Sequence, residues 1–263
     1  MIPIGDNSRR RTTPWVTWGI ILLNVAVFVY LLNLSSAVPR DPRLFNQALG
    51  AQEGGVCYGL AVAPSQVDHF VCKWAWQPKE FFDNLAGRSD VPHPDRPQIM
   101  VSILTALFIH GGWLHIFGNM IFLWVFGDNV EDRLGHFAYL VFYLAAGVVA
   151  SLVQGAVDPT SVVPVLGASG AIAGVLGAYL LFFPKAVVRV VIPFFFLILI
   201  PIPIPAVVMI GLWFLQNLFS GVATVSNAVA PDQGTAWFAH IGGFVFGVLV
   251  ALWALSFRRK SRG

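Results

Sequence analysis

A serine, two histidines and an asparagine stand in apolar stretches of this sequence, where side chains of these types can perform nucleophilic chemistry. Ser169 lies in the run VLGASGAIAG, His240 lies in AHIGG, and His115 precedes Asn119 by four residues. A serine hydroxyl attacks a carbonyl when a neighbouring base takes its proton and fixed donors stabilise the oxyanion that forms. We therefore interpret Ser169 as a nucleophile, His240 as its base, and His115, Asn119 and the Ser169 backbone amide as the oxyanion donors.

The segments that must position these residues are transmembrane helices. Hydrophobic residues make up 57% of the 263 residues and charged residues only 11%, a balance that would leave a water-soluble domain with an apolar surface. A helix needs about 20 mostly apolar residues to cross a bilayer. We predict an all-α polytopic membrane protein, a bundle of six transmembrane helices. The runs that qualify as spans lie near 15–34, 100–126, 136–156, 168–184, 203–221 and 235–257.

The apolar run from 186 to 221 is long enough for two short spans, and its charges and prolines decide how we interpret it. A lysine and an arginine flank its start, and three prolines follow between 201 and 205. Proline removes an amide donor and keeps the preceding residue out of the helical conformation. We predict an interfacial segment at 186–202 and a single span from Pro203.

The basic residues predict which side of the membrane each loop faces. Arginine and lysine gather in the tails at 1–14 and 258–263 and in the loops that six spans place on the same side, whereas the opposite loops at 157–167 and 222–234 contain neither. Since lysine and arginine mark the cytoplasmic side, we predict cytoplasmic termini and candidate site residues that lie towards the outer face. The net charge of +3 is then a topology signal and no sign of a nucleic-acid partner.

The first apolar run and the long loop after it leave alternatives open. A basic start, an apolar core and small residues at 35–37 are also typical of a cleaved signal peptide, but the apolar stretch at 16–34 exceeds the usual core of about 7–15 residues, which favours an anchor. The outer loop at 35–99 contains the two cysteines of the chain, Cys57 and Cys72. On the outer side of a membrane they can form a disulfide or stay as two free thiols.

Small residues at four-residue spacing predict close contact between the fourth and sixth helices. They follow Ser169 and surround His240, at Gly170 and Gly174 and at Ala239, Gly243 and Gly247. Such faces let membrane helices approach closely, which would bring the serine hydroxyl to the imidazole.

An alternative interpretation needs no chemistry, because the glycines can serve packing alone and the serine can simply cap its helix. The second helix favours the chemical interpretation, since His115 and Asn119 are four residues apart and therefore share one helical face. Two donors on one face suit a single developing oxyanion. Polar side chains inside a bilayer are costly, and several at one depth indicate a functional site.

Four short segments in this order resemble the signature motifs of the rhomboid intramembrane serine proteases. They are HGGWLHIFGN at 110–119, VEDRLG at 130–135, GASG at 167–170 and AHIGG at 239–243. The resemblance spans about 100–257 and implies a rhomboid-type six-helix bundle, a serine endopeptidase that cleaves transmembrane protein substrates near the outer face of the membrane. It also implies a catalytic dyad of Ser169 and His240 without an acidic third member, and oxyanion donors at His115 and Asn119.

The resemblance implies supporting roles for further residues, and the sequence departs from the family in two places. Structural roles are implied for His110, Gly167, Gly170, Glu131 and Arg133. The family often has Tyr or Phe four residues after the serine, packed against the catalytic histidine, whereas this chain has Ala173. Other groups must therefore position the imidazole. The outer loop also lacks an obvious Trp-Arg pair of the kind that some members carry.

Other functions fit the sequence less well. His110, His115 and His240 lack the HExxH arrangement and a nearby carboxylate, which argues against a zinc site, and the motifs imply neither a metal nor another cofactor. The spans contain no embedded carboxylate for proton-coupled transport. The main alternative is a non-catalytic relative that binds membrane clients, although such relatives typically lose the serine or the histidine that this chain retains.

The expected partners are transmembrane substrate proteins and the lipid bilayer itself. Water would reach the dyad through the outer loops, and a substrate helix would arrive sideways from the lipid past the fifth helix. The aromatic residues of that helix, Trp213 and Phe214, belong either to a mobile wall or to ordinary packing and anchoring in lipid. The compact six-span form without a targeting peptide suggests the plasma membrane of a bacterial-type cell.

Overall fold

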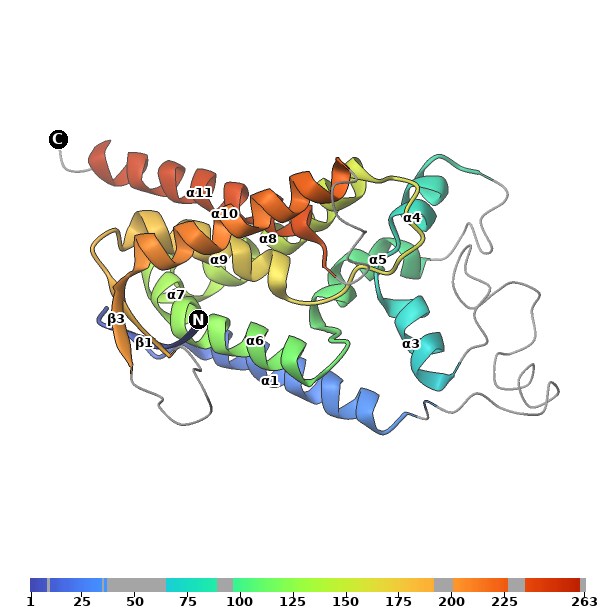
Figure 1. Ribbon diagram of the computed structural model, residues 1–263, viewed down its shortest axis with the longest axis horizontal. Helices are drawn as coiled ribbons and strands as arrows, with labels where there is room; N and C mark the ends of the chain where they lie inside the picture. The colour runs from blue at the N-terminus through green and yellow to red at the C-terminus, as the bar shows by residue number, and fades with distance from the viewer. Residues whose placement is uncertain are drawn as a thin grey trace.

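The computed structural model describes residues 1–8, 10–34, 36, 65–88, 97–191, 201–226 and 235–260. They form a helical bundle with a small sheet at one end (Figure 1). The elements in chain order are β1 (Ile2–Asp6), α1 (Trp15–Leu32), α3 (Gln66–Trp74), α4 (Pro78–Leu85), α5 (Pro97–Thr105), the 3-10 turn η1 (Ala106–Phe108), α6 (Trp113–Phe122), the π-helical turn η2 (Leu123–Gly127), α7 (Asp128–Leu134), α8 (His136–Val157), α9 (Ser169–Phe182), β2 (Val187–Val191), β3 (Ile202–Pro205), α10 (Ala206–Val225) and α11 (Trp237–Lys260). The predicted all-α polytopic class is confirmed, and the sheet is an addition that the sequence analysis did not contain.

Four helices among the described residues are each long and apolar enough to cross a bilayer, namely α1, α8, α10 and the part of α11 at Trp237–Phe257. A further candidate is a bent pair, in which the helix through α5 and η1 meets the helix from α6 to α7 at 78°. α9 is apolar but has only 14 residues. Six spans therefore stay a prediction. α11 continues to Lys260, into the tail predicted at 258–263.

The stretch predicted as one span at 100–126 is divided in the structure. Its first part ends with η1 and its second begins with α6, and the turn between them contains Gly111 and Gly112. Glycine is a poor helix former because its backbone loses the most freedom on ordering. The bend places His115 and Asn119 on the second helix, which turns back into the bundle.

α9 is the central helix of the bundle. All residues from Gly170 to Tyr179 are buried. α8 and α11 make the most extensive contacts with α9, and η2, α7, α10 and α6 complete its surroundings (Figure 1). Large buried side chains around it include Phe126, Tyr139 and Phe244. The helix that begins with the candidate nucleophile is thus held on all sides by the core.

Three short strands form an antiparallel sheet in the order β1-β2-β3. Ile2 lies opposite Val191, and Val190 lies opposite Ile202. The first strand belongs to the region predicted as an N-terminal tail at 1–14. The start of the chain is therefore attached to the segment that leads into α10.

The segment predicted as interfacial, 186–202, contains β2 and the first residue of β3 in its described part. Val188 and Val190 are buried and alternate with the exposed Arg189, which is the two-residue period of a strand. α10 begins three residues after the start predicted at Pro203, because the proline-rich stretch before it is extended and pairs with β2.

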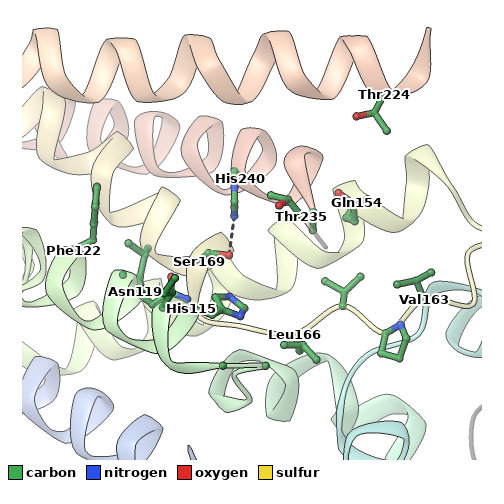
Figure 2. A pocket seen from close by; sticks show the side chains of 18 of the residues that line it. His115, Asn119, Phe122, Gln154, Val163, Leu166, Ser169, Thr224, Thr235 and His240 are labelled. Atoms are coloured by element: carbon green, nitrogen blue, oxygen red, sulfur yellow. Dashed lines mark hydrogen bonds between the residues drawn. The ribbon is translucent and has the colours of Figure 1, made fainter. Parts of the chain in front are cut away.

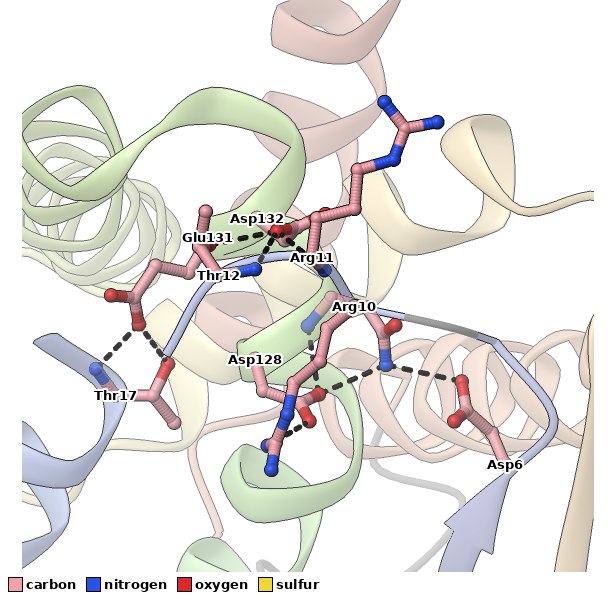
Figure 3. A network of polar contacts seen from close by, with 9 residues as sticks. Asp6, Arg10, Arg11, Thr12, Thr17, Asp128, Glu131 and Asp132 are labelled. Atoms are coloured by element: carbon pink, nitrogen blue, oxygen red, sulfur yellow. Dashed lines mark hydrogen bonds and ion pairs between the residues drawn. The ribbon is translucent and has the colours of Figure 1, made fainter. Parts of the chain in front are cut away.

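A network of carboxylates holds the chain before α1 to α7 (Figure 3). Asp132 accepts hydrogen bonds from the backbone amides of Arg11 and Thr12 and from the Thr12 hydroxyl, at 2.7 to 3.0 Å. Arg10 forms an ion pair with Asp128 at 3.0 Å. Together with β1, these contacts fix the described residues before α1 against one end of the bundle.

The outer loop predicted at 35–99 is described in part. Its residues 65–88 contain α3 and α4, which lie beside α5 at the end of the bundle away from the sheet (Figure 1). The backbone of Trp76, in the turn between α3 and α4, pairs with Val165 in the loop before α9. Cys57 lies outside the described residues, and so does the choice between a disulfide and two thiols.

Candidate active site

A cavity of about 1290 Å³ is lined by parts of α6, α9, α10 and α11 and by the loop before α9 (Figure 2). Ser169, His240, His115 and Asn119 all line it. Figure 2 shows the serine at the centre, with the imidazole of His240 pointing towards it from one side and the α6 side chains on the other. The structure therefore brings together the four residues that the sequence analysis proposed for catalysis.

The serine and the histidine are in hydrogen-bond contact. Ser169 Oγ lies 2.8 Å from His240 Nε2. The serine is the first residue of α9, and the histidine lies in the first turn of α11. The amides at the start of a helix lack intrahelical acceptors, and Gln154 of α8 accepts from those of Phe238 and Ala239 at 3.1 and 3.2 Å. This contact fixes where α11 begins, and with it the position of the imidazole.

The predicted contact between α9 and α11 is confirmed, and glycines make it possible. A Cβ atom placed on Gly243 would collide with the carbonyl oxygen of Gly170, and one on Gly247 would collide with that of Gly174. On the other side of α9, a Cβ on Gly170 would lie 2.6 Å from the Cβ of Ala150 in α8. α9 is thus held between two helices at a backbone distance that side chains would not permit.

Residues of α10 and α11 surround the imidazole of His240, for which the sequence left no partner at Ala173. Nδ1 of the histidine lies 2.6 Å from Oδ1 of Asn217. The Trp213 ring lies 5.7 Å from the imidazole at a tilt of 38°, and the Trp237 ring lies 6.3 Å from it, edge-on. Side chains from α10 and α11 therefore supply the contacts of the imidazole that Ala173 cannot give.

Gly167, His115 and Asn119 lie together beside the serine. Gly167 has a φ of 114°, which glycine adopts and other residues rarely do, and a Cβ there would lie 2.6 Å from Nε2 of His115. The side-chain nitrogen of Asn119 is buried and has no acceptor among the described residues. An unsatisfied buried donor costs about 1–3 kcal/mol, and a donor in this position beside Ser169 is suited to binding an anionic or carbonyl oxygen.

His110 supports this wall rather than lining the cavity. Its side chain is buried, and its ring packs edge-on against His115 with centroids 4.9 Å apart. Within the ranges that the structure describes, no three His, Cys, Asp or Glu side chains are grouped so that they could hold a metal ion.

Glu131 and Arg133 lie at the other end of the bundle, away from the serine. Glu131 is fully buried and accepts hydrogen bonds from the amides of Val16 and Thr17, the Thr17 hydroxyl and His136, at 2.6 to 3.0 Å. Figure 3 shows its contacts with Thr17. The guanidinium group of Arg133 lies over an aromatic ring of α9, 5.5 Å from its centroid. We propose a structural role for both residues, since their contacts join α1, α7 and α9.

Two residues of the site, Asn217 and Gln154, were missed by the sequence analysis. Asn217 stands in an apolar span, and a polar side chain at such a position is itself a signal of a partner inside the bundle. Gln154 lies near the end of α8 in an equally apolar run. Neither residue belongs to one of the four motifs. The polar residue type was the available signal in the sequence, and the sequence did not identify the partner.

The fold and the site define a polytopic helical membrane protein with a serine–histidine pair inside the bundle. The chain belongs to the rhomboid family, because the family model of the Rhomboid domain matches residues 97–257. Family membership and the apolar helices show an integral membrane protein, and the family includes intramembrane proteases.

Relatives with a range of names match parts of the chain. "Rhomboid protein 1, mitochondrial" of Saccharomyces cerevisiae is 32% identical over 161 residues, which are 59% of this chain and 42% of the relative. "Rhomboid protease GluP" of Bacillus subtilis is 41% identical over 78 residues, 30% of this chain and 15% of the relative. "Rhomboid-like protein 11, chloroplastic" of Arabidopsis thaliana is 45% identical over 71 residues, 27% of this chain and 25% of the relative. In each case the matched part spans less than half the length of the relative.

Proposed function

We propose that this protein is a serine endopeptidase that cleaves transmembrane substrate proteins near the outer face of the membrane. Ser169 is the nucleophile and His240 is the general base and acid. The observation that carries the proposal is the 2.8 Å contact between Ser169 Oγ and His240 Nε2, in a cavity that His115 and Asn119 also line. A serine that served packing alone would need neither a basic partner nor buried donors beside it.

The first step forms an ester between enzyme and substrate. His240 Nε2 takes the proton of Ser169 Oγ while this oxygen attacks the carbonyl carbon of the scissile peptide. The carbonyl oxygen becomes an oxyanion, which accepts hydrogen bonds from His115, Asn119 and the Ser169 amide. His240 then gives its proton to the leaving nitrogen, and the peptide C–N bond breaks. Asn119 gains in this way the acceptor that it lacks among the described residues.

The second step returns the enzyme to its starting state. A water molecule attacks the ester carbon while His240 takes a proton from it, and the same oxyanion donors act again. The bond to Ser169 Oγ breaks, the oxygen regains its proton from His240, and the new carboxyl end of the substrate leaves. Both protons therefore pass through one nitrogen, Nε2, and no cofactor takes part.

Substrate and water approach the cavity from different directions in this proposal. The loop before α9 lines one side of the cavity and includes the polar residues Asp158 and Ser161, which suit water, whereas Trp213 of α10 lines another side, which suits a substrate helix that arrives from the lipid. Phe214 stacks on Phe244 of α11 with ring centroids 4.4 Å apart, so this aromatic residue packs within the bundle. A mobile α10 stays a prediction. Undiminished cleavage after cross-linking of α10 to α6 would contradict it.

We place both termini in the cytoplasm and the dyad towards the outer face of a bacterial-type plasma membrane. α1 begins and α11 ends at the same end of the bundle, beside the sheet (Figure 1), and basic residues gather in both terminal regions. Ser169 begins α9 at the end of that helix away from the sheet. A reporter fused to either terminus tests the orientation, and fractionation of the cells tests the membrane.

The test of the catalytic role uses detergent-purified protein and a fluorophosphonate probe, which reacts with activated serines. We expect the wild type to label and the variants Ser169→Ala and His240→Ala to lose labelling while they remain folded. Ser151→Ala is the matched control, because this serine is also buried in a helix, α8, but does not line the cavity. Cleavage of a transmembrane reporter in proteoliposomes should follow the same pattern.

The competing function is that of a non-catalytic protein that binds membrane clients. If the wild type neither labels nor cleaves under conditions in which an active rhomboid protease does both, Ser169 is a packing residue and the client-binding function takes the place of the protease. Co-purification of a transmembrane client equally with wild type and Ser169→Ala would then be its positive sign.

A further inference from the structure

We propose that Asn217 is a positioning residue that fixes the orientation and the tautomer of His240 for the reaction, an inference that rests on the proposed function. The hydrogen bonds form a chain from Ser169 Oγ to His240 Nε2 at 2.8 Å and from His240 Nδ1 to Asn217 Oδ1 at 2.6 Å. The three residues come from α9, α11 and α10. The resemblance to the family implies only the first two, so the third member follows from the structure.

The contacts of the Asn217 amide determine which of its ends faces the histidine. Its Nδ2 donates to the carbonyl oxygen of Trp213, one turn earlier on α10, at 2.7 Å. A carbonyl oxygen only accepts hydrogen bonds, so the nitrogen of the amide must face Trp213 and the oxygen must face His240. The reverse orientation would place two acceptors against each other at Trp213. The amide is therefore held by its own helix with its acceptor towards the imidazole.

The tautomer of the imidazole follows from that orientation. Oδ1 of Asn217 can only accept, so Nδ1 of His240 must carry the proton in the 2.6 Å contact. A neutral imidazole has one N–H, which leaves Nε2 as the acceptor for the Ser169 hydroxyl. This is the form that a general base needs. When His240 becomes an imidazolium in the transition state, both N–H groups keep acceptors.

The burial of Asn217 also favours a defined role. Only 2% of the residue is exposed, on a helix that is apolar enough to cross a bilayer. A buried amide inside a membrane is costly unless its donor and acceptor are both satisfied, and Trp213 and His240 satisfy one each. Trp213 also places its ring beside the imidazole. α10 thus supplies both the polar and the aromatic support that Ala173 cannot give.

The chain offers a matched control for this residue in Asn24 of α1. Asn24 is fully buried, and its Nδ2 donates to the carbonyl oxygen of Ile20 at 2.8 Å, the same bond to the residue four positions earlier. It does not line the cavity. Replacing either asparagine by leucine removes a buried amide of the same shape and the same local hydrogen bond. Only the change at Asn217 also removes an acceptor from His240.

The experiment measures kcat and KM for a transmembrane reporter with wild type, Asn217→Leu, Asn217→Ala, Asn217→Asp and Asn24→Leu, after each is shown to be folded. We expect Asn217→Leu and Asn217→Ala to lower kcat about 10- to 100-fold, the worth of one hydrogen bond to a charged group, and to leave KM unchanged because Asn217 is not in the cavity lining. Asn217→Asp should recover most of kcat, since a protonated carboxyl group donates to the carbonyl oxygen of Trp213 and accepts the same bond from Nδ1. Asn24→Leu should keep the wild-type kcat.

The outcomes separate this inference from the proposed function. A wild type that cleaves, beside a folded Asn217→Leu or Asn217→Ala with kcat within about twofold of it, overturns the role of Asn217 and leaves the protease intact. An equal loss of kcat in Asn24→Leu also overturns it, because the loss then comes from the missing amide and not from the histidine. A loss in Asn217→Leu that Asn217→Asp does not recover overturns the assignment of an acceptor. A wild type without cleavage or labelling refutes the proposed function itself.

Discussion

Replacing Gly243 by alanine tests whether the distance between α9 and α11 sets the rate of the reaction. The added Cβ would collide with the carbonyl oxygen of Gly170 and would lie 3.0 Å from the carbonyl carbon of the same residue. Both atoms belong to the backbone of the helix that begins with Ser169. No side chain can rotate out of the way, so the two helices must separate.

The size of that separation predicts the loss of activity. Non-bonded carbon atoms meet at about 3.5–4.0 Å, so α11 must move away from α9 by roughly 1 Å. If His240 moves with its helix, the distance from its Nε2 to Ser169 Oγ grows from 2.8 Å to roughly 3.8 Å, beyond hydrogen-bond range. A misplacement of about 1 Å lowers a rate about 100-fold. Overpacking of this kind also lowers stability by about 1–3 kcal/mol.

The assay is kcat for cleavage of a transmembrane reporter in proteoliposomes, with the free energy of unfolding measured in a denaturing detergent. Gly19→Ala is the control, since a Cβ on this exposed residue of α1 meets nothing within 4 Å among the described residues. Alanine is the better helix former by about 1 kcal/mol, so the control should be at least as stable as the wild type and equally active. A folded Gly243→Ala protein with wild-type kcat would refute the reasoning that this contact positions the dyad.

Four further substitutions probe other contacts. Glu131→Gln should lower the free energy of unfolding by about 1–3 kcal/mol, because its NH2 group faces a backbone amide donor in either orientation; Asp132→Asn, at the exposed part of the same network, should cost less than about 1 kcal/mol. Gly167→Ala should reduce probe labelling at least tenfold in a folded protein, since the Cβ collides with His115 at a φ of 114°. Gln154→Leu should speed hydrogen exchange of the two amides that it accepts from at the start of α11 and should lower kcat. Unchanged exchange there would show that water replaces the glutamine.

The candidate site could be predicted from the sequence because its chemistry requires particular residue types, whereas the fold accepts many residue types at most positions. A hydroxyl, an imidazole and a carboxamide are costly in an apolar span, so Ser169, His240 and Asn119 stand out from their surroundings. The glycines at four-residue spacing also predicted the close contact between two helices from the sequence alone, since only small residues let helices approach to backbone contact. Residue type and local spacing led to both predictions, and the resemblance to the family motifs supported the roles of the residues.

The sheet and the role of Asn217 depend on partners that are distant along the chain. A short apolar run such as that of β2 can form either a buried strand or the end of a helix, because both have the same composition. It is a strand in this structure because it pairs with β1 from the start of the chain. Asn217 was visible as a polar residue in an apolar span, but its partner lies on another helix. Local spacing contains no information about such a contact. The bend between η1 and α6 was predictable only in part. Gly111 and Gly112 indicated a break in the helix, but the apolar residues on both sides of them indicated one continuous span.

The shortness of α9 and the cavity at its beginning are two parts of one arrangement. A helix of 14 residues rises about 21 Å, whereas the hydrocarbon core of a bilayer is about 30 Å thick. One end of α9 must therefore lie below the membrane surface, although the first amides of a helix have no intrahelical acceptor and an unsatisfied amide in lipid costs several kcal/mol. Protein must shield that end from lipid, and water must be able to reach it. At Ser169 the cavity and the loop before α9 meet both conditions, so the shortness of α9 would also give its first hydroxyl the water that the proposed hydrolysis requires.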